Sequence, residues 1–185
     1  MSRRNRSTMM NEYEFALKFR LPDAGADPEH FVDALAEAGC DDALVGVGQR
    51  GRITLDFNRE ARSAVEAVTS AIRDVKQAIP GAELVEASPD FVSATDVAEL
   101  AGCSRQNVRK WIISHAATFP LAVHEGSPSV WHLANVLAWL GEQQKRPVDT
   151  VLLEIAETNM KVNIAKETHR LPGALLPKEF APLFV

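Results

Sequence analysis

Residues 104–111 gather cationic and amide side chains in a pattern that suits contact with nucleic acid. The polar residues recur at helical spacing and would share one face of a helix: Arg105, Gln106, Arg109 and Lys110. An arginine can form two hydrogen bonds with guanine and a glutamine two with adenine, whereas phosphates attract any cation. In the first turn we therefore expect Arg105 and Gln106 to contact base edges. One turn later we expect Arg109 and Lys110 to hold phosphates.

The surrounding residues predict the scaffold that such a helix needs. Residues 94–111 read ATDVAELAGCSRQNVRKW, which indicates two short helices joined by a tight turn. Ala98 allows the helices to approach closely, Gly102 can end the first helix in the left-handed conformation, and Ser104 is a good N-cap for the second. The residues expected to pack between the helices are Val97, Ala101, Val108 and Trp111. This layout is typical of a helix-turn-helix, whose second helix enters the major groove. The alternative is a helical hairpin with a merely solvated polar face.

A hairpin is expected to follow the second helix. Residues 121–124 and 129–132 are predicted strands, and Glu125-Gly126-Ser127-Pro128 between them is a turn cluster. A further helix is predicted from the apolar spacing of Leu133, Val136, Leu137 and Leu140. A hairpin in this position is a wing, which typically touches phosphates or the minor groove. The expected DNA contacts are Thr95, Ser104, Arg105, Gln106, Arg109, Lys110, His124 and Ser127.

Residues 91–140 resemble a known DNA-binding family. The segment SATDVAELAGCSRQNVRKW, the FP that opens the wing, and VWHLANVLAWL resemble the winged helix-turn-helix of the MerR-like and AlpA/excisionase-like domains. The resemblance covers about 50 of the 185 residues and implies DNA binding without specifying an operator. It departs from the family in the wing, which often carries several basic residues. Here the wing has only His124 and His132, together with the acidic Glu125.

Residues 11–88 predict a separate domain with the order β-α-β-β-α-β. The expected strands are 13–21, 43–47, 53–57 and 82–87, and the expected helices are 28–38 and 65–79. This order suggests a ferredoxin-like sandwich with two helices on one sheet face, so the chain as a whole is expected to be α+β. Such a fold does not specify a function. Pairing with another chain, sensing a small ligand and docking a protein all remain open.

Motifs in this domain point to structure more than to chemistry. Asp41-Asp42 is more typical of a loop or cap than of a site. The glycines of residues 46–51, GVGQRG, precede a strand rather than a helix, which argues against a phosphate-binding loop. The central strands lack the paired aromatic positions of a ferredoxin-like RNA binder.

Charge is unevenly distributed along the chain. The net charge is −5, and residues 11–90 carry 8 Lys and Arg against 16 Asp and Glu, whereas residues 91–141 carry 3 of each. A neutral DNA-reading module makes few phosphate contacts, so a single copy is expected to bind weakly. We therefore expect a homodimer that presents two copies to paired half-sites.

A long helix is predicted near the C-terminus, after linkers at residues 88–90 and 141–147. Residues 148–169 carry an apolar stripe that includes the polar Asn159. Either a partner subunit covers this stripe or the helix packs back on the N-terminal domain. We favour the partner, because the module needs a dimer and a polar residue in an apolar seam can set pairing register.

The two chain ends are treated as additions to these domains. Residues 148–185 form the predicted helical arm and apolar tail, and the tail is expected to dock on its own domain or on another protein. Residues 1–10 are expected to be a disordered basic extension, with a minor-groove arm formed by Arg3, Arg4 and Arg6 as the weaker reading.

Catalysis and metal binding are not predicted. The five histidines show no metal-ligand spacing, and Cys40 and Cys103 lie far apart, as suits a reducing cytoplasm. Residues 1–10 lack the apolar core of a secretory signal, and no apolar run approaches the length of a membrane span.

The sequence thus predicts a cytoplasmic, dimeric, sequence-specific DNA-binding protein without a cofactor, a transcriptional regulator rather than an enzyme. One alternative is a regulator whose main partner is a protein, such as an autoregulating antitoxin. Another is a regulator that senses a small ligand through its N-terminal domain.

Overall fold

A computed structural model describes residues 10–171 as a mixed α+β protein. This part of the chain has six helices, a four-stranded antiparallel sheet and a two-stranded sheet. The strands are β1 (Asn11–Arg20), β2 (Ala43–Gly46), β3 (Arg52–Ala61), β4 (Glu83–Ser88), β5 (Phe91–Val92) and β6 (Trp131–His132). The helices are α1 (Val32–Glu37), α2 (Ala64–Ala78), α3 (Ala94–Leu100), α4 (Arg105–Ser114), α5 (Leu133–Gln143) and α6 (Thr150–Arg170).

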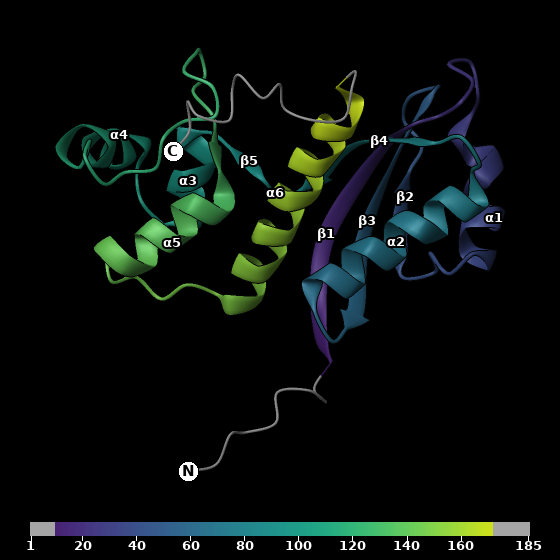
Figure 1. The fold of residues 1–185 in the computed structure, drawn as a ribbon, viewed down its shortest axis with the longest axis horizontal. Helices are drawn as coiled ribbons and strands as arrows, with labels where there is room; N and C mark the ends of the chain where they lie inside the picture. The colour runs from purple at the N-terminus through teal and green to yellow at the C-terminus, as the bar shows by residue number, and fades with distance from the viewer. Residues whose placement is uncertain (1–9, 172–185) are drawn as a thin grey trace, which may run out of the picture.

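The predictions made for Arg3, Arg4 and Arg6 and for the apolar tail 172–185 lie outside the described residues. Figure 1 shows the larger sheet with α2 at one end of the molecule, α4 at the other end, and α6 between them. No helix among residues 10–171 has the length and apolar character needed to cross a membrane.

The larger sheet has the strand order β2-β3-β1-β4, and every neighbouring pair is antiparallel. Side chains of β1 alternate between the two faces of the sheet, as the sequence predicts. One set is buried beneath the helices and consists of Tyr13, Phe15, Leu17 and Phe19. The other set is exposed apart from the half-buried Ala16, and its charged members are Glu12, Glu14, Lys18 and Arg20.

The predicted helix at 28–38 is only partly helical. Residues Pro28–Phe31 form a 3-10 turn, and α1 is confined to Val32–Glu37. Asp27 caps the turn by accepting a hydrogen bond from the backbone N–H of Glu29, and Gly39 follows α1 with a φ of 99°. Stop signals at both ends leave room for less than two full turns of α-helix.

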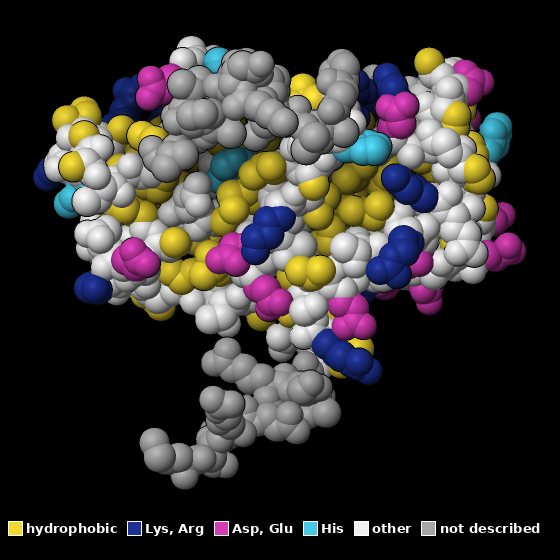
Figure 2. Space-filling view, viewed as in Figure 1, with side chains coloured by type: hydrophobic (Ala, Val, Ile, Leu, Met, Phe, Trp, Pro, Cys, Tyr) yellow, Lys and Arg dark blue, Asp and Glu magenta, His cyan; other side chains and the backbone are white. Residues whose placement is uncertain are grey.

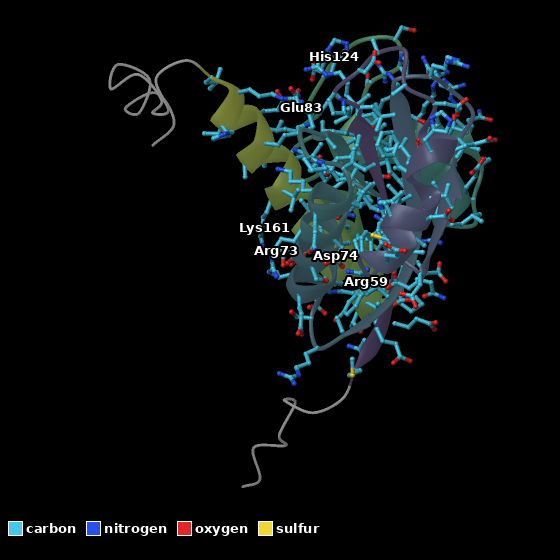
Figure 3. All side chains as sticks on the ribbon, turned by 90° about the vertical axis from the view of Figure 1, so that its right-hand side faces the viewer. Arg59, Arg73, Asp74, Glu83, His124 and Lys161 are labelled. Carbon is cyan, nitrogen blue, oxygen red and sulfur yellow. The ribbon has the colours of Figure 1, made fainter. Side chains whose placement is uncertain are left out.

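Arg59 is buried beneath α2, and two carboxylates neutralise it. Its guanidinium lies 2.6 Å from Asp42 Oδ2 and 2.7 Å from Asp74 Oδ2, and it also donates to Ser70 and to the Gly39 carbonyl. Figure 3 shows Arg59 beside Asp74. Burial alone would lower the pKa of Arg59, but the bonds and charges of the two carboxylates raise it above its ordinary value. Asp42 is therefore a structural residue.

Helix α6 packs on its own chain, so the favoured prediction of a partner subunit over its stripe was wrong. A polar stripe on α6 runs along the outer edge of β4 at positions i, i+4, i+7 and i+11: Asn159, Asn163, Lys166 and Arg170. These side chains donate in turn to the backbone carbonyls of Pro89, Ala87, Val85 and Leu84. Asn163 Oδ1 also accepts from the Ala87 N–H at 2.9 Å. Asn159 thus bonds to the β4–β5 junction and does not set the register of a dimer.

The two flanks of this polar stripe are apolar and belong to different cores. Ile155 is buried in the core under the larger sheet, with Val151 and Val162 packed beside it. Ala156 is buried in a second core built around α3, α4 and α5. Figure 2 shows hydrophobic side chains in the seams on both sides of α6. The apolar residues of α6, for which the sequence favoured a partner subunit, therefore pack against other parts of the same chain.

The predicted wing hairpin is also shorter than expected. His124 and Val130 form an isolated bridge, whereas Trp131–His132 pair with Phe91–Val92 to make the two-stranded sheet. The reason is Asp90, whose backbone carbonyl accepts from the Leu133 N–H at 2.6 Å. Its carboxylate lies 2.7 Å from His132 Nδ1 and accepts from Asn163 Nδ2 at 2.8 Å. These contacts draw the end of the wing towards β5.

Replacing Asn163 tests this buried polar junction. Asn163→Ala leaves the Ala87 N–H and C=O and one Asp90 oxygen without their partner, at a cost of about 1–3 kcal/mol for each buried unpaired group. We expect the free energy of unfolding to fall by about 3 kcal/mol in chemical denaturation. Lys161→Ala, on the exposed side of the same helix, serves as the control and should change it by about 0.5 kcal/mol or less. Equal losses in the two variants would contradict the assigned role.

The two cysteines should differ in reactivity. Burial, reinforced mainly by the negative charge of Asp74, raises the pKa of the Cys40 thiol to about 11, whereas Cys103 is half-buried beside α4. The thiolate is the reactive form, so at pH 8 Cys40 is protonated and inaccessible. Ellman's reagent should therefore label one thiol in the folded protein and two in denaturant. Cys103→Ser should abolish the native signal, and persistent native labelling of that variant would contradict this assignment.

Candidate nucleic-acid interface

Local hydrogen bonds define the start of α3 and the start of α4, and a glycine forms the turn between them. Ser93 Oγ accepts from the backbone N–H groups of Thr95 and Asp96, while Asp96 Oδ2 accepts from the Ser93 N–H at 2.7 Å. This reciprocal capping box begins α3. Gly102 follows α3 with a φ of 58°, and Ser104 Oγ then accepts from the Asn107 N–H to cap α4. The predicted helix, turn and helix are therefore present at the expected positions.

The inner face of α4 is locked into an aromatic core. Val108 is completely buried, and Trp111 is 8% exposed. The Trp111 ring packs 5.9 Å from that of Trp139 on α5, which in turn lies 4.9 Å from Phe119. With its inner side chains held in this way, α4 has a single free face.

That free face carries the cations. Arg105, Arg109 and Lys110 are exposed, and within residues 10–171 none of the carboxylates forms an ion pair with them. Helix α4 itself contains neither Asp nor Glu. Unpaired cations on an otherwise rigid helix leave their full charge available to an anionic ligand.

Two surface recesses divide the predicted contact residues. The first has a volume of about 190 Å³ and lies between the start of α3, α4 and the loop at 126–129. Its predicted contact residues are Thr95, Arg105, Arg109 and Ser127. The second is a groove of about 560 Å³ along the outer face of α4. Its predicted contact residues are Ser104, Gln106, Arg109 and Lys110. Arg109 borders both.

The loop at residues 121–130 contains no Lys or Arg, and its backbone is held by hydrogen bonds between its two ends. Val123 N–H donates to the Val130 carbonyl at 2.8 Å, and Val130 N–H donates to the His124 carbonyl at 2.9 Å. A Cβ atom on Gly126 would lie 2.1 Å from His124 Nε2, so the His124 ring rests against the loop backbone. Figure 3 shows His124 at one extremity of the molecule. His124 does not line either recess, and His132 is engaged with Asp90.

Sequence reasoning missed Arg146. This residue lies in the segment predicted as a polar linker, yet its guanidinium donates to the Ala101 carbonyl at the end of α3. The guanidinium also lies over the Trp111 ring, 5.3 Å from the ring centre. Arg146 thus ties the α5–α6 connection to both helices of the pair. Its position in a polar run gives no local signal of this contact.

The described residues contain no group of three metal-ligating side chains. Comparison of the chain with protein-family models, with curated proteins and with solved structures gave no match. The geometry of α4 and its surroundings therefore carries the functional conclusion.

Arg146 offers a test of how the helix pair is held. Arg146→Gln should remove the cover of Trp111 and weaken the bond to Ala101, lowering the free energy of unfolding by about 1–2 kcal/mol. The neighbouring Lys145→Gln removes an equal charge from an exposed side chain and should have little effect. Tryptophan fluorescence is a suitable probe, because Trp111, Trp131 and Trp139 all lie in this core. Matching denaturation curves for the two variants would exclude the proposed anchor.

Proposed function

We propose that this protein is a sequence-specific DNA-binding transcriptional regulator whose helix α4 enters the major groove. The observation that carries the proposal is the set of unpaired cations Arg105, Arg109 and Lys110 on the free face of α4. Their carrier helix is capped at its start and packed by Val108 and Trp111. A rigid, cationic, groove-sized helix is the element that reads DNA in helix-turn-helix proteins.

Two finer aspects of the fold belong to this proposal. The antiparallel order β2-β3-β1-β4, with α1 and α2 on one face, supports a ferredoxin-like N-terminal domain. The succession of α3, α4, the loop bridged at His124 and Val130, and α5 supports a winged helix-turn-helix. The free thiols of Cys40 and Cys103 are in keeping with a cytoplasmic location.

The two recesses suggest that different residues of α4 contact the DNA backbone and the bases. Arg105 lines the narrow recess with Thr95 and Ser127, a set of cationic and hydroxyl groups suited to one phosphate. Gln106 and Lys110 line the outer groove, where base edges would lie. We therefore assign Arg105 to the backbone and Lys110 to a base, the reverse of the assignment made from sequence alone.

A homodimer remains part of the proposal, because one module supplies few phosphate contacts. Both apolar flanks of α6 are occupied by its own chain, so pairing has to use another surface. Among residues 10–171, no helix covers the sheet face that carries Glu12, Glu14, Lys18 and Arg20, and we propose this face for pairing.

Selection from random duplex DNA at low salt, followed by anisotropy titrations of the selected site, tests the function. We expect Arg105→Ala to weaken all sequences alike and to reduce the salt slope by about 1 per module. Lys110→Ala and Gln106→Ala should each lose about 1–3 kcal/mol of discrimination against a mutated site. Lys161→Ala removes a cation from α6 and is the control.

Two outcomes of this experiment would contradict the proposal or its residue assignments. Failure of the wild-type protein to prefer any sequence would reject sequence-specific DNA binding. Relaxed preference in Arg105→Ala with uniform weakening in Lys110→Ala would restore the assignment made from sequence alone.

A further inference from the structure

Ile113 is the most conspicuous apolar side chain on the α4 surface. It is 79% exposed, although its neighbour Ile112 is half-buried against the second core. A β-branched residue has a below-average helix propensity, so an exposed helical position does not favour isoleucine. Because most of its surface is exposed, Ile113 adds little to the folded core, which directs attention to what it contacts outside the chain.

Ile113 shares the outer groove with the polar residues proposed to read bases. Gln106, Lys110 and Ile113 stand at positions i, i+4 and i+7 and line the same recess. At a rise of 1.5 Å per residue, the separation of Gln106 and Ile113 along α4 is about 10 Å. That length corresponds to about three base steps of DNA, each about 3.4 Å.

The major groove offers one apolar group, the C5-methyl of thymine. Resting on the proposed DNA-binding function, we propose that Ile113 contacts a thymine methyl and thereby helps to determine sequence preference. Gln106, one end of the same line, suits an adenine through its N6 and N7 atoms. Each half-site therefore contains a thymine methyl about three steps from the base pair that Gln106 reads.

The test removes a single methyl group from the DNA. Once selection has defined the preferred site, each thymine is replaced in turn by deoxyuridine, and affinities are measured by anisotropy with the full-length protein. At one position the wild type should lose about fourfold in affinity, the value of one buried methyl group. Ile113→Ala should bind the thymine and deoxyuridine sites equally.

Two further variants keep the result interpretable. Leu121→Ala alters an 87% exposed side chain outside the α4 groove and should retain the full methyl effect. Ile113→Val should retain part of it. Circular dichroism and the melting temperature of Ile113→Ala should match the wild type, because the truncated side chain is exposed.

The inference is overturned if the wild type and Ile113→Ala respond alike to deoxyuridine at every thymine. It is also overturned if Ile113→Ala changes the molecular mass in light scattering and leaves the methyl effect intact, because Ile113 is then a protein contact. A wild-type protein that selects no sequence rejects both this inference and the proposed function. Specific binding with an unchanged methyl response rejects the inference alone.

Discussion

The buried carboxylate of Asp90 is the point at which the parts of this molecule are joined. Its side chain is completely inaccessible to solvent, and an unpaired carboxylate there would be strongly unfavourable. Its oxygens instead meet Asn163 of α6 and His132 of β6, while its backbone carbonyl accepts from Leu133 at the start of α5. The carboxylate thus joins α6 to β6, and the backbone carbonyl of the same residue adds the start of α5, so one residue fixes the positions of three elements.

Helix α6 extends this constraint over the length of β4. An edge strand exposes unpaired backbone groups that invite pairing with another chain. Side chains of the stripe from Asn159 to Arg170 bond to several carbonyls along this edge and to the Ala87 N–H. Ile155 and Ala156, on the two flanks of the stripe, enter separate cores. The same helix thus protects the sheet and fixes the orientation of the α3–α4 pair relative to it. Helix α4 stands at the far end of the molecule, clear of this junction (Figure 1).

Sequence patterns predicted the elements that depend on local signals. The alternation along β1, the stop at Gly102 and the cap at Ser104 each have a physical cause within a few residues, and each is present. The covering of α6 could not be predicted in this way, because an apolar stripe does not specify what packs on it. Its polar residues resemble a solvated face in sequence, yet they bind the edge of β4.

The same distinction applies to the candidate interface. The residue types on α4 follow from the sequence, but their division between two recesses depends on the position of the loop at 126–129, which is far along the chain. The contact of Arg146 with Ala101 is likewise non-local and escaped prediction. The two-residue strand Phe91–Val92 was too short to produce a periodic signal.

The two ends of the molecule differ in how their positive charges are paired. In the acidic N-terminal half, several cations are engaged by carboxylates: Arg59 by Asp42 and Asp74, and Lys18 by Glu86. On α4 the cations stand without such partners among the described residues, on a helix that contains no acid. A polyanion approaching the molecule is therefore repelled by the sheet end and attracted to α4. Because the Asp90 junction holds α6 against β6 and the start of α5, these two ends keep a fixed relative position, and the charge difference between them acts along one axis of the molecule.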